Sequence, residues 1–295
     1  MAVLVTGSSG MLGRVLSKQL EKSGKVLGVS RRGEDGGIKC DLSDAPSVEK
    51  LFEAHPIDLV IHTAAYSDVD GCERDPKLAH AANAEAPRHI AEACGKRGLP
   101  WIHVSTDYVF DGRKRTPYKE EDATGPVNIY GVTKWIGEFY AKNSVTPCAN
   151  VRVSWLFGGP NPKNFVNAIA ERIKKENVVS ALDDQTDAPT SVKDLSLALE
   201  KMVSHLKKLP KGTRWNETFH VCNGGGTTRL EMTEAIRDFM GKKSVRVEKG
   251  DASKITGRVA IRPAYAVMDN SHFEKTFGMK IRPWRESLRE YIESL

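Results

Sequence analysis

The sequence predicts an α/β fold in which helices cover both faces of a parallel, doubly wound sheet. Short apolar runs alternate with amphipathic helical stretches along the first half of the chain, which is the order that right-handed crossovers require. The first apolar run ends in a glycine-rich turn that opens the first helix. The chain has 295 residues, 40% hydrophobic and 28% charged, and this composition is typical of a globular protein large enough for such a fold.

The expected strands and helices follow one another in a regular order. Apolar runs that end in glycine or small polar residues predict strands, and they lie at 2–7, 25–30, 58–65, 101–110, 150–158 and, late in the chain, 217–225. Apolar residues at helical spacing predict helices, and they lie at 11–24, 46–55 and 84–98 and from about residue 130 onward.

Charge and cysteine content exclude several classes of protein. The net charge is +6, but the basic residues are scattered among acidic ones, so we interpret them as ordinary surface residues. Nucleic-acid binding is therefore the least favoured alternative function. A mildly basic surface also suits an anionic, phosphorylated substrate. Five cysteines lie far apart without a C-x-x-C pair, which gives no support for a zinc or redox site. The chain shows no signal-peptide pattern and no apolar run near the ~18 residues of a membrane span, so we expect a cytoplasmic protein.

The turn after the first strand is the first candidate binding site. In "VTGSSGMLGRVL" glycines permit a tight turn, close approach of the backbone to phosphate and close helix packing. The N–H groups at the start of the following helix attract a pyrophosphate. We therefore expect a Rossmann-type dinucleotide site that uses Gly7, Ser9, Gly10, Met11, Leu12 and Gly13. The G-x-x-G-x-x-G spacing is typical of short-chain dehydrogenases.

The end of the second strand indicates which dinucleotide binds. An NAD site usually has an acidic residue there, whereas Ser30, Arg31 and Arg32 offer a hydroxyl and two cations, which suit a 2′-phosphate. We expect NADP(H); Glu34 and Asp35 follow closely and keep NAD(H) as an alternative. The remaining expected cofactor contacts are Asp41 and Leu42 beside the adenine, and Ala64 and Ala65 after the third strand.

A tyrosine and a lysine in "NIYGVTKWIGEFY" suggest the chemistry. Tyr130 and Lys134 are one turn apart on a helix face. They could be an ordinary surface pair. Alternatively, a cation within roughly 4–6 Å lowers the pKa of a phenol, ordinarily ~10, by about 1–3 units, which would fit Tyr130 for proton transfer.

Six longer phrases, in order along nearly the whole chain, carry a family resemblance. They are "HTAAYSDVDGCERDP", "VSTDYVFDG", "NIYGVTKWIGE", "VRVSWLFGG…NFV", "DDQTDAPTSVKDL" and "RPAYAVMDNSHFEKTFGMKIRPW". With the glycine turn they resemble the dTDP-4-dehydrorhamnose reductase family of extended short-chain dehydrogenases/reductases. The resemblance implies an oxidoreductase of nucleotide-sugar (dTDP-rhamnose) biosynthesis that reduces a 4-keto group with NADPH.

The resemblance also implies roles for individual residues. Thr106 would bind the C4 oxygen of the substrate, Tyr130 would be the general acid, and Lys134 would orient the nicotinamide ribose and lower the tyrosine pKa. The substrate contacts it implies are Ser67, Val69, Asp107, Tyr108 and Trp155, with Lys163, Asn164 and Arg262 as candidates for the diphosphate. Trp155 and Tyr108 could instead be core residues, and Thr106 an ordinary strand-end threonine.

The chain lacks a linker rich in proline, glycine or serine, so we expect two interleaved units. The NADP-binding domain would comprise 1–157 and about 183–235, and the substrate-binding lobe about 158–182 and 236–295. Ser17 and Val192 stand where some bacterial relatives have acidic residues that bridge a dimer through magnesium. We therefore expect no metal, and a homodimer remains an open alternative.

Two other functions fit the same motifs. A nucleotide-sugar epimerase or dehydratase on this fold would hold NAD tightly and recycle it. A non-catalytic regulatory subunit, resembling that of methionine adenosyltransferase, would bind a protein partner; Thr106, Tyr130 and Lys134 argue against it, because such a subunit needs no catalytic residues.

Overall fold

A parallel sheet of seven strands forms the centre of the computed structural model, which describes residues 2–160, 164–210, 212–254 and 256–295. Its strand order is β10-β6-β5-β4-β1-β2-β3, and each neighbouring pair is parallel. The strands are β1 (Ala2–Thr6), β2 (Lys25–Ser30), β3 (Ile38–Lys39), β4 (Leu59–His62), β5 (Trp101–Thr106), β6 (Cys148–Val153) and β10 (Asn216–His220). The predicted α/β class and doubly wound sheet are confirmed.

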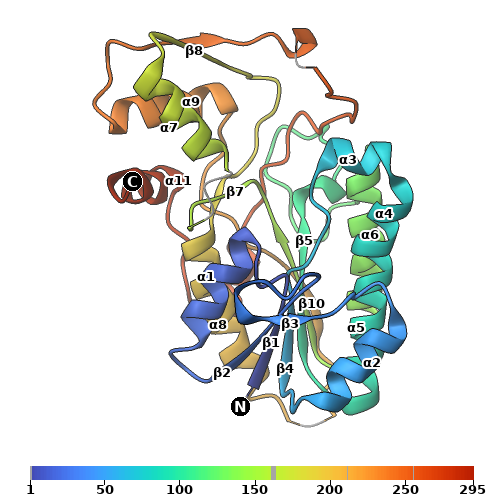
Figure 1. Cartoon of the computed structure of the whole chain (residues 1–295). Helices are drawn as coiled ribbons and strands as arrows, with labels where there is room; N and C mark the ends of the chain where they lie inside the picture. The colour runs from blue at the N-terminus through green and yellow to red at the C-terminus, as the bar shows by residue number, and fades with distance from the viewer. Residues whose placement is uncertain (1, 161–163, 211, 255) are drawn as a thin grey trace.

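Helices cover both faces of this sheet (Figure 1). One face carries α1 (Met11–Leu20) and α8 (Val192–Leu206), and the other carries α2 (Ala45–Ala54), α5 (Ala86–Arg97) and α6 (Ile129–Lys142). The shorter helical segments are α3 (Val69–Arg74), α4 (Pro76–His80), α10 (Ser271–Phe277), the 3-10 turns η1 (Glu34–Gly36), η3 (Asp107–Val109) and η4 (Ala252–Lys254), and the π-helical turn η2 (Ala81–Glu85). In the part of the chain that is described, no helix is long and apolar enough to cross a membrane.

Alternation along the strands builds a core on each side of the sheet. In β1, Val3 and Val5 pack with Leu16 of α1 and Leu199 of α8, whereas Leu4 joins the core under α2 and α5. Successive strand residues point to opposite faces, and a sheet covered on both sides therefore needs near-continuous apolar strands. Because successive side chains enter two different cores, the residues of the central strands β1, β4, β5 and β6 are buried, and the sequence shows unbroken apolar runs.

A second group of elements lies above the carboxyl ends of the strands (Figure 1). It comprises α7 (Phe165–Lys175), α9 (Arg229–Phe239), α11 (Trp284–Glu293) and a two-stranded sheet of β8 (Val178–Ala181) and β11 (Arg246–Lys249). These helices share a core of their own that includes Val166, Ile236 and Leu288. The packing therefore joins α9 to the lobe, and α10, through Phe273, to the main core. We propose the interleaved division with α9 on the lobe side and α10 on the side of the NADP-binding domain.

A short two-stranded ribbon connects the two units. It pairs β7 (Leu156–Phe157) with β9 (Thr190–Ser191). The expected strand at 150–158 is thus broken between β6 and β7 at Trp155, whose φ of +36° is the one positive value among the described residues other than glycine. A left-handed conformation is strained for a bulky residue, and it redirects the chain from the sheet toward the lobe.

Candidate active site

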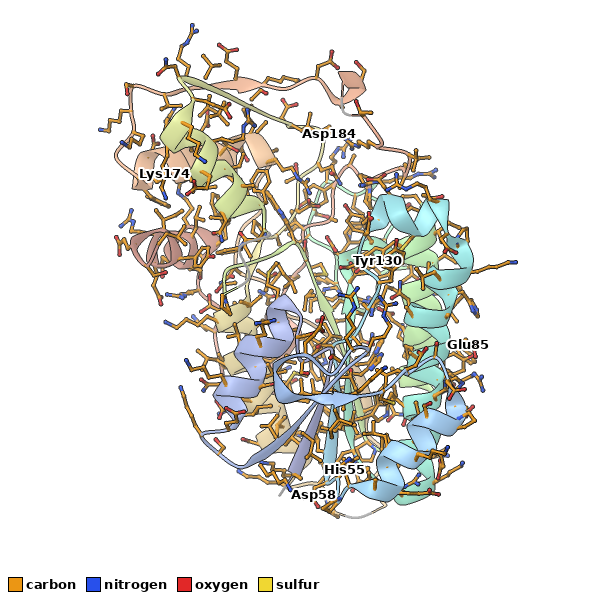
Figure 2. All side chains as sticks on the ribbon, in the orientation of Figure 1. His55, Asp58, Glu85, Tyr130, Lys174 and Asp184 are labelled. Atoms are coloured by element: carbon orange, nitrogen blue, oxygen red, sulfur yellow. The ribbon has the colours of Figure 1, made fainter. Side chains whose placement is uncertain are left out.

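A cavity of about 740 Å³ opens at the carboxyl ends of β1, β2, β4, β5 and β6. Ligands of doubly wound folds bind at this edge of the sheet. Figure 2 shows Tyr130 inside the molecule at this level, whereas His55 and Asp58 mark the opposite end of the sheet. Sequence-predicted residues that line the cavity are Gly7, Ser9, Gly10, Met11, Leu12, Gly13, Ser30, Arg31, Arg32, Asp41, Leu42, Ala64, Ala65, Ser67, Val69, Thr106, Asp107, Tyr108, Tyr130, Lys134 and Trp155.

The glycine turn is packed so closely that side chains would not fit. Gly7 has a φ of +66°, and a Cβ there would lie 2.8 Å from the Ala64 Cα. A Cβ on Gly13 would lie 2.1 Å from the Gly7 carbonyl oxygen. The backbone of the turn therefore lines the cavity directly, and α1 begins there at its N-cap, Gly10. These features fit a dinucleotide pyrophosphate, because helix N-termini present N–H groups to anions.

The end of β2 supplies the cationic part of the cavity. Arg31 and Arg32 line it with exposed side chains, and the nearest Arg32–Glu34 approach is 3.7 Å. The Ser30 hydroxyl accepts hydrogen bonds from the N–H groups of Gly33 (2.9 Å) and Glu34 (3.2 Å). Ser30 thus shapes the turn that carries the two arginines, and its own hydroxyl proton is left for another acceptor.

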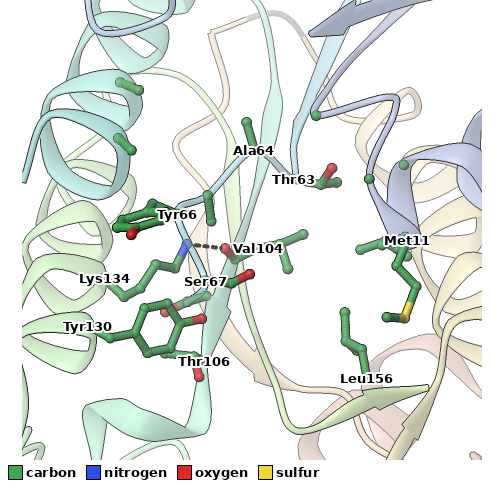
Figure 3. Close-up of a pocket in the computed structure, with 18 of the residues that line it drawn as sticks. Met11, Thr63, Ala64, Tyr66, Ser67, Val104, Thr106, Tyr130, Lys134 and Leu156 are labelled. Atoms are coloured by element: carbon green, nitrogen blue, oxygen red, sulfur yellow. Dashed lines mark hydrogen bonds between the residues drawn. The ribbon is translucent and has the colours of Figure 1, made fainter. Parts of the chain in front are cut away.

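Helix α6 brings Tyr130 and Lys134 to the other side of the cavity. Its N-cap Asn128 accepts a hydrogen bond from the Gly131 N–H (2.8 Å). A Cβ on Gly131 would lie 2.2 Å from the Tyr108 carbonyl oxygen, so this glycine lets α6 start directly against η3. The two side chains, one helical turn apart in the sequence, therefore both face the end of β5 (Figure 3).

Lys134 is a buried ammonium group, 2% exposed. Its Nζ donates a hydrogen bond to the Val104 carbonyl oxygen at 2.6 Å (Figure 3). Burial lowers the pKa of Lys134 from 10.5 to about 8, although the carboxylate of Glu138, one turn further on, partly offsets this. Taking an ammonium out of water favours its neutral form, so the site holds this lysine close to its titration point.

Burial sets the direction of the Tyr130 pKa in this structure. Burial raises the pKa of the Tyr130 phenol well above its usual range, while a hydrogen bond with Thr106 lowers it and the Asp107 carboxyl raises it again. Helical spacing predicts proximity but not burial, and the Lys134 ammonium is bonded to the Val104 oxygen. A lowering of the Tyr130 pKa by Lys134 therefore stays a prediction. A phenol that stays protonated at neutral pH can still donate a proton.

Thr106 stands at the end of β5 within a hydrogen-bonded chain. Its hydroxyl donates to Asp107 Oδ1 at 2.8 Å and accepts the Tyr108 N–H at 3.2 Å. Asp107 Oδ2 in turn accepts the Ser154 hydroxyl at 2.7 Å. Burial, and then the carboxyl of Asp187, raise the pKa of Asp107. The hydroxyl oxygen of Thr106 is therefore fixed in place beside Tyr130.

The segment between β8 and β9 and the start of α9 add two residues to the cavity that the sequence reasoning missed, Asp187 and Arg229. The Arg229 guanidinium lies over the Trp155 ring at 4.7 Å, and Trp155 meets Phe165 edge to face at 5.2 Å between ring centroids. Asp187 lies in the quoted phrase "DDQTDAPTSVKDL", but residue type gave it no role. The T-x-x-E capping box at Thr228 could have placed Arg229 at a helix start, though not in the cavity.

Two expected diphosphate contacts, Arg262 and Asn164, are not found in the described lining of the cavity. Arg262 Nη1 and Nη2 bond Asp70 at 3.0 and 2.5 Å, so the structure gives this guanidinium a carboxylate partner instead. Asn164 caps α7 by accepting the Asn167 N–H at 3.1 Å. Lys163 lies outside the described residues. Arg262 and Asn164 thus tie segments of the fold together, which sequence spacing does not reveal.

The residues described in the structure contain no group of three or more His, Cys, Asp or Glu side chains that could hold a metal ion. Ser17 of α1 is partly buried, and Val192 at the start of α8 belongs to the main core. The cysteines are buried and unbonded to one another.

A family model described as the RmlD substrate binding domain matches residues 1–295. The chain belongs to this family. A dTDP-4-dehydrorhamnose reductase of Streptomyces griseus is 35% identical over 294 residues, with 99% of this chain and 93% of that protein covered. The reductase of Mycolicibacterium smegmatis is 33% identical, with coverage of 99% and 85%. These relatives are oxidoreductases, and the RmlD-family chain described here is an enzyme of the same class.

Solved structures of the RmlD family superpose on the whole chain. A dTDP-4-dehydrorhamnose reductase from Clostridium acetobutylicum has a TM-score of 0.89 at 32% identity, and it covers 100% of this chain and 99% of its own. A Bacillus anthracis reductase in complex with NADP has a TM-score of 0.88 at 27% identity, with the same coverage. The predicted family and fold are therefore confirmed.

Proposed function

We propose that this enzyme uses NADPH to reduce the 4-keto group of a nucleotide-linked 6-deoxy sugar, as in the conversion of dTDP-4-dehydrorhamnose to dTDP-L-rhamnose. The observation that carries the proposal is the meeting of three groups at the end of β5. The Tyr130 phenol, the anchored Thr106 hydroxyl and the buried Lys134 ammonium face the same cavity as the glycine turn. The names of the RmlD relatives support the reaction class.

Each side chain has a distinct part in this reaction. When bound, the reduced nicotinamide supplies the hydride. Negative charge then develops on the carbonyl oxygen of the sugar, and Tyr130 gives up its proton to that oxygen. The Thr106 hydroxyl donates to Asp107 in the absence of ligand, and in the reaction it turns its one proton from Asp107 to the same oxygen. Lys134 adds positive charge on this side of the cavity and orients the cofactor ribose. Burial keeps Tyr130 protonated until that charge develops.

The cofactor preference rests on the end of β2. A 2′-phosphate suits two exposed guanidinium groups because arginine pairs with phosphate through two parallel hydrogen bonds. Arg31→Ala and Arg32→Ala should each lower kcat/KM for NADPH by roughly 10- to 100-fold and leave that for NADH nearly unchanged. Arg246→Ala, an exposed change in β11, is the matched control. An equal loss with both cofactors would contradict the assignment of these arginines.

The experiment follows the absorbance of the reduced nicotinamide. The purified enzyme receives the 4-keto-6-deoxy-L-sugar nucleotide in dTDP and UDP forms, each with NADPH and with NADH. We expect consumption of NADPH with a keto substrate and none without it. No consumption with any of the four combinations, although the protein binds NADPH, would overturn the proposal.

The alternative functions gain no support. A regulatory subunit does not need a protonated phenol, a fixed hydroxyl and a buried ammonium group in one cavity, yet all three are present. An epimerase or dehydratase would recycle its cofactor, and it would show no net consumption of NADPH in the same assay.

A further inference from the structure

Asp187 is a buried carboxyl group in the cavity to which the proposed reaction gives no role. Its side chain lines the cavity and the residue is 2% exposed. Its backbone is fixed by two hydrogen bonds with Thr227, Asp187 N–H to the Thr227 oxygen at 3.0 Å and the reverse at 2.9 Å. The side chain is thus held on the cavity wall by a backbone bridge rather than by a mobile loop.

One oxygen of this carboxyl group lacks a partner. Asp187 Oδ1 is buried and makes no hydrogen bond with any of the described residues. Oδ2 lies 3.9 Å from Arg229 Nη1, too far for a hydrogen bond. Buried polar atoms without partners are rare because they lose their hydration without compensation. Because Asp187 Oδ1 lies on the cavity wall, we expect a bound ligand to donate a hydrogen bond to it.

Arg229 is held beside the Asp187 carboxyl group as its cationic neighbour. Its Nη1 donates to Gln185 Oε1 at 3.1 Å, and its guanidinium lies over the rings of Trp155 at 4.7 Å and Phe165 at 5.8 Å. Burial raises the pKa of Asp187, and Arg229 lowers it. The guanidinium acts as a fixed positive neighbour, and Asp187 keeps one oxygen for the cavity.

The charges around Asp187 decide what kind of donor fits. Asp107 and Tyr108 of η3 and Asp184 of its own segment surround it, with Arg229 as its nearby cation. Two carboxyl groups on one wall repel a phosphate or a sugar carboxylate. A neutral hydroxyl group can donate to Oδ1 without this repulsion. The wall therefore fits the ring of a neutral sugar rather than the diphosphate.

We propose that Asp187 determines sugar specificity by accepting a hydrogen bond from a ring hydroxyl of the bound sugar, with Arg229 as its positioning residue. The inference rests on the proposed function and adds a substrate contact to it. It predicts that the enzyme distinguishes a 4-keto sugar nucleotide from the analogue that lacks the recognised hydroxyl. It also predicts that this discrimination, rather than turnover as such, depends on Asp187.

The test compares kcat/KM for the 4-keto-6-deoxy sugar nucleotide with kcat/KM for its 2-deoxy and 3-deoxy analogues. We expect the unaltered enzyme to lose roughly 10- to 100-fold on one of the two analogues, the range for a hydrogen bond to a charged group. Asp187→Ala should reduce that ratio to about one, and Asp187→Asn, which keeps an acceptor oxygen, should leave part of it. A ratio of this kind is insensitive to a uniform loss of folded enzyme.

The matched control is Asp183→Asn, which removes a carboxylate of the same segment that is paired with Lys249 at 3.0 Å and is absent from the described cavity lining. This variant should keep the full ratio. The inference fails if Asp187→Ala distinguishes the parent sugar from its deoxy analogues as strongly as the unaltered enzyme does, or if the unaltered enzyme does not distinguish them. The proposed reductase activity is unaffected by either result. If the parent keto sugar is not reduced at all, both fail.

Discussion

The buried ammonium group of Lys134 should make the enzyme less stable than a variant without it. The pKa of Lys134 falls from 10.5 to about 8 on burial, and this difference corresponds to about 3 kcal/mol. Replacement by methionine removes that cost but also removes the hydrogen bond to the Val104 oxygen, worth about 1 kcal/mol. We therefore expect Lys134→Met to raise the free energy of unfolding of the protein without cofactor by about 2 kcal/mol at pH 7.

The sign of the pH dependence follows from proton counting. Between pH 8 and 10.5 the folded protein has released the Lys134 proton, whereas the unfolded chain still holds it. Stability rises with pH wherever the unfolded state binds more protons. The unaltered protein therefore gains stability across this range relative to Lys134→Met. The advantage of the variant should be complete below pH 8 and absent near pH 10.5.

Urea unfolding followed by tryptophan fluorescence at pH 7 and pH 10 measures both effects. Lys18→Met, an exposed change on α1, is the control and should alter stability by less than about 0.5 kcal/mol. The same Lys134→Met protein should lose NADPH affinity and turnover, so stability and function would change in opposite directions. The reasoning would be refuted if Lys134→Met were less stable than the unaltered protein at pH 7. It would also be refuted if the variant exceeded the unaltered protein in free energy of unfolding by the same amount at both pH values.

Two further substitutions test the packing around the site. Gly13→Ala places a Cβ 2.1 Å from the Gly7 oxygen. We therefore expect NADPH binding, measured by titration calorimetry, to weaken at least about tenfold and the protein to lose about 1–3 kcal/mol of stability. Gly125→Ala, whose Cβ meets nothing closer than 3.4 Å, is the control and should change neither NADPH binding nor stability. Glu138→Gln removes the negative charge and one of the two oxygens that accept 2.8 Å hydrogen bonds from the buried Arg152, and it should cost about 3–5 kcal/mol in urea unfolding at pH 7. Because that pairing lowers the Glu138 pKa from 4.5 to about 2, the cost should fade as pH falls from about 4.5 toward 2, and a cost unchanged by acid would contradict it.

Local sequence signals predicted the sheet because they coincide with its geometry. The strands β1, β2, β4, β5, β6 and β10 are apolar runs with clear stops, and the glycine turn is required where backbone atoms nearly touch. The ribbon of β7 and β9 could not be predicted, because each strand has two residues and forms only where the lobe meets the sheet. Hydrophobic periodicity and strand propensity identify a strand only over a longer stretch of sequence.

Interactions between distant segments limited the prediction of the site. The spacing of Tyr130 and Lys134 gave their shared helix face, but the direction of each pKa depends on burial by the whole fold. The pairing of Arg262 with Asp70 joins residues 192 positions apart, so sequence reasoning could not show that this expected phosphate ligand has a carboxylate partner within the fold. Asp187 was missed for the same reason, since its neighbours come from separate segments.

The central claim is that Tyr130 is the proton donor in the reduction of a 4-keto sugar nucleotide. The most direct measurement is single-turnover oxidation of bound NADPH by Tyr130→Phe and by the unaltered enzyme, with NADPH affinity measured on the same samples. The account predicts that turnover falls by about 10²–10⁴-fold while NADPH affinity changes less than about threefold, because the phenylalanine keeps the ring and loses only the hydroxyl. Unchanged turnover in Tyr130→Phe would contradict it.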